Sequence, residues 1–291
     1  HPINQPVRFP IDFSRGFNTP FPHLEKLRRS CNLFEWRSRY FAETGDTDQA
    51  VLSILVMLRL CHLLDDEPAP ISTLTAFSGY MMGKSQIEKL INLRVLNDAQ
   101  LTSLQKAFSS FQLHKHLAAG YIGERALILG AEQVARTGSK EEMERAGLGQ
   151  IDKPGSAFML ALRYRPDTMR DVEMTAFLGF MNAGIEALKA GYPGLTKFHD
   201  TKNEFWSKWD RFFALAGKQQ HKLKYPLILI VTPALNRTGQ KLHEATFKQQ
   251  ATLAALAIER YRLANQGRIP KTLAQLTPKY LATEPFDPYT G

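Results

Sequence analysis

One acidic residue stands where a carboxylate could do chemistry. Glu124 lies in a stretch with helical periodicity from about His114 to Thr137. Five apolar residues surround its angular position on that helix: Leu117, Tyr121, Ile128, Ala131 and Ala135. Burying an ionised carboxylate without a partner costs on the order of several kcal/mol. Glu124 is therefore expected either to pair with an arginine or to stay protonated with a raised pKa.

Three arginines are candidate partners of Glu124, and these are Arg163, Arg165 and Arg170. A buried ion pair that fixes the register of two helices is the preferred interpretation, because no second catalytic group accompanies Glu124. The alternative is a hydrolase-like enzyme in which Glu124 acts as general acid or base in a cleft between helices. Arg163 and Arg165 are also candidate binding residues. An enzyme is thus less favoured than a binding protein.

A second candidate site is the basic, aromatic segment 202–225. Its candidate binding residues are Trp206, Lys208, Trp209 and Arg211. Such residues could stack bases and neutralise phosphates, or lie in a membrane interface. On a helical wheel the aromatic residues share one face, which favours an ordinary amphipathic helix with that face in the core. Nucleic acid is therefore not an expected partner, and peripheral membrane contact stays open.

Standard catalytic and metal-binding spacings do not occur in the sequence. It contains no HExxH, GxSxG or CxxC, and no GxGxxG after a strand. His114 and His116 are two residues apart, which on a helix points their rings about 200° apart, so the pair is not expected to chelate one metal. Neither a metal site nor a cofactor is expected.

The two cysteines flank a predicted helix-helix turn. Cys31 and Cys61 are each 15 residues from Asp46. The pair Gly45-Asp46 marks the turn at which the first helix should end and the second begin. An antiparallel hairpin would place them at similar height. A disulfide is possible if their Cα atoms come within about 7 Å. Two buried free thiols are preferred, because helix axes usually lie about 8–10 Å apart.

Periodicity and turn signals predict an all-α fold of stacked antiparallel helical hairpins around a long buried C-terminal helix. An extended arm (1–22) precedes a helical-hairpin half (23–138). A loop-rich connection (139–166) then leads to a C-terminal helical half with a tail (167–291). Helices are expected over about 47–64, 71–96, 114–137 and 167–189, with capping boxes at 97–100 and 139–142. We treat the whole as one continuous domain.

The longest helical signal lies in KLHEATFKQQATLAALAIERYRLANQGRIPKTLAQL, residues 241–276. Asn265, Gln266 and Gly267 predict a left-handed helix exit, and Pro270 predicts the start of a short helix with Leu273 and Leu276. The run AIERYRLANQGRIP, followed later by DPYTG at residues 287–291, resembles the second half of the long helix of type II secretion pseudopilins and the loop after it. The whole layout resembles uncharacterised bacterial helical proteins with this ending.

A second resemblance concerns the first hairpin, whose join FAETGDTDQA resembles the turn of a tetratricopeptide repeat. A second copy at a 34-residue period is not evident. The two resemblances imply a bacterial helical protein that binds other proteins. They do not imply a pilin subunit, because Gln266 is inserted before the turn glycine, Ile269 replaces a tyrosine, and no prepilin-type hydrophobic N-terminus precedes the helices.

Composition and charge limit the remaining classes. The chain has 291 residues, 44% of them hydrophobic, so it can bury a large core and is not of the disordered class. The net charge of +9 would suit an anionic partner, yet the charges are spread along the chain. No apolar run approaches the roughly 20 residues of a membrane span. We expect an exported scaffold protein of the periplasm or envelope that binds another protein, with a cytoplasmic location as the alternative.

Overall fold

The computed structural model describes residues 8–148, 164, 166–190 and 226–286, with side chains of the last range from residue 244. These residues form helices and no strands, which confirms the all-α prediction. The α-helices are α1 (Pro22–Glu43), α2 (Thr47–Cys61), α3 (Pro70–Leu93), α4 (Asp98–Ser109), α5 (Leu113–Thr137), α6 (Lys140–Arg145), α8 (Asp167–Lys189) and α11 (Pro226–Ala264). Short 3₁₀ helices are η1 (Phe13–Asn18), η2 (His62–Leu64) and η3 (Leu273–Leu276).

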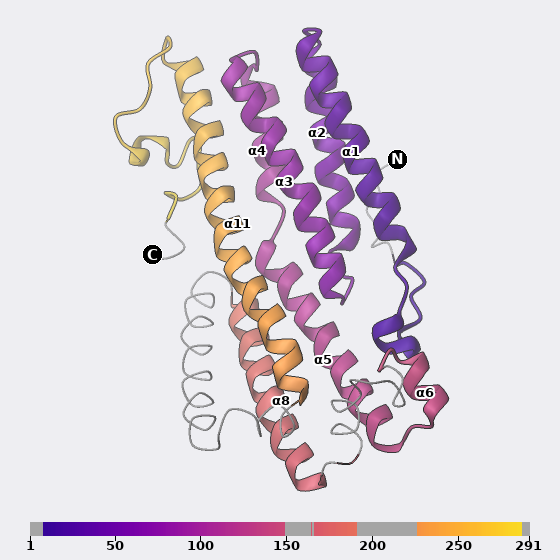
Figure 1. Cartoon of the computed structure of the whole chain (residues 1–291). Helices are drawn as coiled ribbons and strands as arrows, with labels where there is room; N and C mark the ends of the chain where they lie inside the picture. The colour runs from indigo at the N-terminus through magenta and orange to yellow at the C-terminus, as the bar shows by residue number, and fades with distance from the viewer. Residues whose placement is uncertain (1–7, 149–163, 165, 191–225, 287–291) are drawn as a thin grey trace.

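The long helices lie side by side in an elongated bundle (Figure 1). The α1–α2 hairpin packs on α3, and α2 also contacts α4. In the other half of the bundle α5 packs against α8. The C-terminal helix α11 contacts α3, α4, α5 and α8, so it joins both halves (Figure 1). The expected central C-terminal helix is therefore present.

Helix termini follow the predicted capping signals. Asp46 caps α2 by accepting a hydrogen bond from the backbone N–H of Gln49. Asn97 with Gln100, and Ser139 with Glu142, form reciprocal capping boxes at the starts of α4 and α6. After α11 the chain turns with positive φ at Gln266 (57°) and Gly267 (84°), as predicted.

Two predicted boundaries were wrong. Helix α11 begins at Pro226 and not near residue 241, because its helical path continues through Pro233. Helix α8 has the predicted bounds, Asp167–Lys189. The short helix η3 begins at Leu273 rather than at Pro270. The two differences reflect the weak positional information that single prolines carry.

An aromatic stack links α3, α4 and α5. Tyr80 stacks on Phe108 and Phe111 with ring centroids 4.3 and 4.5 Å apart, and His116 stacks on Phe111 at 4.2 Å. The Tyr80 hydroxyl donates to the Phe108 carbonyl at 2.8 Å. Gln249 of α11 donates to the carbonyls of Phe108 and Phe111 at 3.2 and 3.0 Å. This stack holds the His116 ring at the start of α5.

The described part of the N-terminal arm is attached to the body by aromatic and polar contacts. The ring of Phe9 stacks on His23 of α1 at 4.0 Å. His23 Nε2 lies 2.9 Å from a carboxylate oxygen of Glu67, a buried residue before α3 that also accepts from Ser72. The arm is not wholly extended as predicted, because η1 forms within it and contacts α5 and α6.

One described stretch is long and apolar enough to cross a membrane by length and composition, although the sequence was not expected to contain a span. It is Thr47–Leu64, with 18 residues and a mean hydropathy of 1.4. It comprises α2 and η2, and 44% of it is buried inside the protein. Core helices of soluble proteins pass the same test, and α2 packs against α1, α3 and α4.

Candidate functional site

The outer face of α1 carries three large exposed side chains. Leu33, Trp36 and Tyr40 are 65, 67 and 62% exposed. Their three- and four-residue spacing places them on one side of the helix, opposite the buried Leu27 and Cys31. Exposed apolar residues scattered singly are ordinary, whereas an apolar stripe on a helix surface is typical of a binding site. We call these three residues the α1 stripe.

Arginines border the α1 stripe. The Arg39 guanidinium lies over the Trp36 ring, 5.3 Å from its centroid, and it also pairs with Glu35. Arg37 lies over Phe41 at the same distance. A broad aromatic surface with cationic edges is the composition that protein interfaces favour.

A polar cluster forms where α2 ends and α5 begins. Asp65 follows η2 and accepts from two histidines: His116 Nε2 lies 2.8 Å from Oδ1, and His62 Nδ1 lies 3.0 Å from Oδ2. The other ring nitrogen of His62, Nε2, lies 3.0 Å from the hydroxyl of Ser110. His116 is buried at 4% exposure, because its ring continues the aromatic stack. The cluster thus joins three separate segments.

The electrostatics of the cluster centre on Asp65. Partial burial would raise the pKa of this carboxyl, but hydrogen bonds from His116 and His62 outweigh it and lower the pKa to about 2. Next to the cluster, burial lowers the pKa of His114 and the charges of Lys115 and His116 add to the effect. Asp65 therefore presents an ionised carboxylate at neutral pH.

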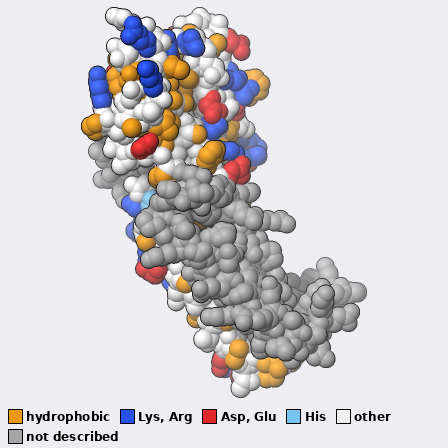
Figure 2. Space-filling view, turned by 90° about the vertical axis from the view of Figure 1, so that its left-hand side faces the viewer, with side chains coloured by type: hydrophobic (Ala, Val, Ile, Leu, Met, Phe, Trp, Pro, Cys, Tyr) orange, Lys and Arg blue, Asp and Glu red, His pale blue; other side chains and the backbone are white. Residues whose placement is uncertain are grey.

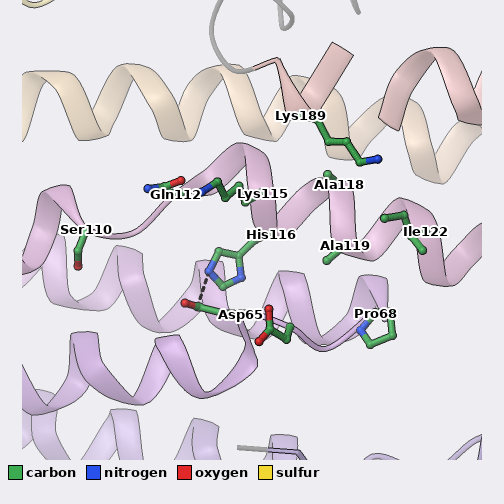
Figure 3. Close-up of a pocket in the computed structure, with 11 residues that line it drawn as sticks. Asp65, Pro68, Ser110, Gln112, Lys115, His116, Ala118, Ala119, Ile122 and Lys189 are labelled. Carbon is green, nitrogen blue, oxygen red and sulfur yellow. Dashed lines mark ion pairs between the residues drawn. The ribbon is translucent and has the colours of Figure 1, made fainter. Parts of the chain in front are cut away.

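A cavity of about 610 Å³ opens beside the cluster. Its polar lining includes Asp65, Ser110, Gln112, Lys115, His116 and Lys189. Figure 3 shows His116 facing Asp65, while Lys189 extends from α8 on the opposite side of His116. The cavity has the size of a small-ligand site, and its lining carries both signs of charge, with two aspartates and two lysines.

Ser110, His62 and Asp65 have the residue types of a hydrolytic triad, but their hydrogen bonds do not fit one. The Ser110 hydroxyl donates to the Ala107 carbonyl at 2.8 Å, so toward His62 it accepts. His62 therefore donates from Nε2, where a general base would need a lone pair facing the serine. This arrangement does not activate Ser110 as a nucleophile.

Glu124 is half-buried and does not line this cavity. Burial raises the pKa of Glu124. It lies near Tyr121, whose pKa is raised by burial and by the charge of Glu124. The structure thus places Glu124 in a partly desolvated position apart from the two histidines.

The suggested pairing of Glu124 with Arg170 was wrong. Arg170 pairs with Glu132, with Nη1 and Oε1 3.1 Å apart, and both residues are buried. Helices α5 and α8 run antiparallel, since Arg125 near the middle of α5 donates to Asn182 toward the end of α8. Arg170, at the start of α8, therefore meets the C-terminal part of α5, two turns beyond Glu124.

The two cysteines face each other inside the N-terminal hairpin. Cys31 and Cys61 are free thiols with exposures of 1 and 0%. Both sulfur atoms border Gly79 of α3, where an added Cβ would lie 3.0 Å from Cys31 Sγ and 2.8 Å from Cys61 Sγ. The hydrogen bond with Cys31, together with burial, raises the pKa of the Cys61 thiol.

Six candidate binding residues lie outside the described residues, namely Arg163, Arg165, Trp206, Lys208, Trp209 and Arg211. The amphipathic helix expected in the segment 202–225 lies there too. On the face that carries the C-terminal segment, Lys and Arg alternate with Asp, Glu and apolar side chains over the coloured surface (Figure 2). This mixture agrees with the even spread of charge along the sequence.

Sequence reasoning missed the polar cluster. His116 was considered only with His114, and His62 and Asp65 were not singled out. Their spacing of three residues, directly after an apolar helix, was the available signal, because it puts both side chains on one side of a helical turn. His116 comes close to His62 and Asp65 only because α3 packs against α5. No local sequence pattern predicts this contact.

Comparison with known proteins adds no relationship to these observations. No protein-family model matches the chain, and searches of curated proteins and of solved structures return no match.

Proposed function

We propose that the chain is a non-enzymatic helical scaffold protein that binds another protein through the α1 stripe. The observation that carries the proposal is the exposure of Leu33, Trp36 and Tyr40 on the side of α1 that faces away from the core. Trp and Tyr contribute most of the affinity in many protein interfaces because they bury a large area with few rotatable bonds. The partner would present a complementary apolar surface.

Sequence resemblances support the same proposal. The first hairpin resembles a tetratricopeptide repeat, whose relatives bind peptides and proteins, and the stripe lies on the first helix of that hairpin. The pseudopilin-like ending around residues 257–270 favours a bacterial envelope location. The alternative of a hydrolase that uses Glu124 has less support, because Glu124 does not line the cavity that contains His116.

Site-specific crosslinking tests the proposal. In one variant of the tagged protein, expressed in its own cells, a photoreactive residue replaces Trp36. In a second variant the same photoreactive residue replaces Val172, an exposed residue of α8. A protein captured in stoichiometric amount from position 36 and not from position 172 supports the proposal. Equal capture at both positions, or none at position 36, contradicts it.

Substitutions then measure the stripe with the captured partner. Trp36→Ala should weaken binding by about 30-fold, which corresponds to the loss of about 2 kcal/mol at an interface hot spot. Val172→Ala is the matched control and should leave the affinity unchanged. Unchanged binding by Trp36→Ala and Tyr40→Ala would remove the stripe from the interface.

A further inference from the structure

The polar cluster has the composition of a metal site. His62, Asp65 and His116 each offer one ligand atom, and these three atoms lie within 4.8 Å of one another. In a tetrahedral site with bonds of about 2.0–2.1 Å, neighbouring ligand atoms are about 3.3 Å apart. Asp65 Oδ1 lies 2.8 Å from His116 Nε2 and 3.2 Å from His62 Nδ1, so only small movements are required to reach that separation.

The hydrogen bonds around His62 provide an independent argument. A metal-binding histidine normally donates its other ring N–H to a protein acceptor, which fixes the tautomer and the ring orientation. His62 Nε2 lies 3.0 Å from Ser110 Oγ, which donates onward to the Ala107 carbonyl. His62 Nε2 therefore carries a proton, and Nδ1, the atom that faces Asp65, is the ring nitrogen that a metal would bind. The metal would take the place of the proton that Nδ1 donates to Asp65 in the metal-free protein.

The other ligands are held in place before any ion binds. His116 is buried and its ring stacks on Phe111, so it is restrained without a metal. Asp65 and His116 line the cavity of about 610 Å³, whereas His62 supports Asp65 from the side of Ser110. Three protein ligands would leave one coordination position for water or an anionic group from the cavity, next to Lys115 and Lys189.

We propose that His62, Asp65 and His116 bind one divalent cation of the borderline class, such as Zn²⁺, with an open position facing the cavity. Two imidazoles and a carboxylate suit Zn²⁺ and similar transition metals. Mg²⁺ and Ca²⁺ prefer sets of six or more oxygen ligands, which this cluster does not supply. The proposal is independent of the α1 stripe, which lies on the outer face of another helix.

Calorimetric titration of the chelator-treated chain with Zn²⁺ tests the site. We expect one ion per chain, and Co²⁺ should give the visible absorption of a tetrahedral complex. His62→Gln, Asp65→Asn and His116→Gln should each weaken binding by more than about 100-fold, and Ser110→Ala by about tenfold as an outer-shell partner. His114→Gln, two residues from His116 and outside the cluster, is the matched control and should bind normally.

Thermal unfolding with and without Zn²⁺ provides a second readout, because an ion that binds the folded state raises its melting temperature. Wild type and His114→Gln should be stabilised, whereas Asp65→Asn should not. Asp65 is half-exposed, so this variant keeps the test valid should His116→Gln fail to fold. Absence of Zn²⁺ binding below millimolar concentration, or equal binding by wild type and all three ligand variants, would overturn the proposal.

Discussion

Two neighbouring residues at the end of α2 meet opposite environments. Cys61 is sealed among α1, α2 and α3, with its sulfur against Gly79 and near Cys31. His62, the next residue, turns toward Asp65 and Ser110, which line a solvent-accessible cavity. The first contact is held by close packing and the second by directed hydrogen bonds. The end of a single helix therefore contributes one residue to the hydrophobic core and the next residue to a polar site.

Among the substitutions considered, we expect Gly123→Ala in α5, next to the polar cluster, to lower the stability most. A Cβ at Gly123 would lie 1.5 Å from the carbonyl oxygen of Pro68, which follows Asp65 and Asp66 in the loop that lines the cavity. Gly123→Ala must therefore separate α5 from that loop and should lower the free energy of unfolding by more than about 3 kcal/mol. Urea denaturation measures the change.

Gly130→Ala is the control on the same helix, because nothing lies within 4 Å of its added Cβ. This substitution should raise the free energy of unfolding by up to about 1 kcal/mol, since alanine favours the helix more than glycine does. Similar losses from both substitutions would show that close approach to Pro68 is not what restricts residue 123.

We expect a smaller loss of stability from a substitution beside the two cysteines. Gly79→Ala places a methyl group 2.8 Å from Cys61 Sγ and 3.0 Å from Cys31 Sγ, and should lower the free energy of unfolding by about 1–3 kcal/mol. Combining it with Cys31→Ala removes one of the crowded sulfur atoms. In a double-mutant cycle the pair should therefore lose less stability than the sum of the single variants. Strict additivity would contradict crowding at the sulfur atoms.

We expect the smallest change in stability from the protonation of Asp65 at low pH. The folded pKa of Asp65 is about 2, below its ordinary value of 3.8, so its stabilising contribution is present above about pH 4 and is lost as the pH falls toward 2. The Asp65 side chain is 46% exposed, so solvent screening limits this contribution to about 1 kcal/mol or less. Stability measured on chelator-treated protein should favour wild type over Asp65→Asn at pH 5, with the difference shrinking by pH 2. A constant difference would contradict the assignment.

Most helix boundaries could be predicted because their signals are local. The Asn97–Gln100 and Ser139–Glu142 boxes, the Asp46 cap and the turn at Gln266 each depend on a few consecutive residues. The position of Cys31 beside Cys61 followed from the symmetry of a hairpin about its turn. In contrast, the start of α11 was missed because Pro233 reads as a helix breaker although the helix continues through it.

The candidate site could not be predicted, because its parts meet only in three dimensions. His62 and His116 are separated by a complete helix pair, and the aromatic stack that orients His116 involves residues of α3, α4 and α5. Glu124 drew attention for the apolar residues around it, yet the antiparallel register of α5 and α8 assigns Arg170 to Glu132. Periodicity identifies a buried face but not which residue of another helix lies opposite.

The two hydrogen bonds from Gln249 bear on the order in which the protein is completed during synthesis. They bind the carbonyls of Phe108 and Phe111, 141 and 138 residues earlier in the chain, where the end of α4 exposes backbone acceptors. A nascent chain can form the α1–α2 hairpin early, but it cannot satisfy those acceptors in this way until α11 has left the ribosome. Pairing of these two acceptors with Gln249 is therefore a late, long-range step.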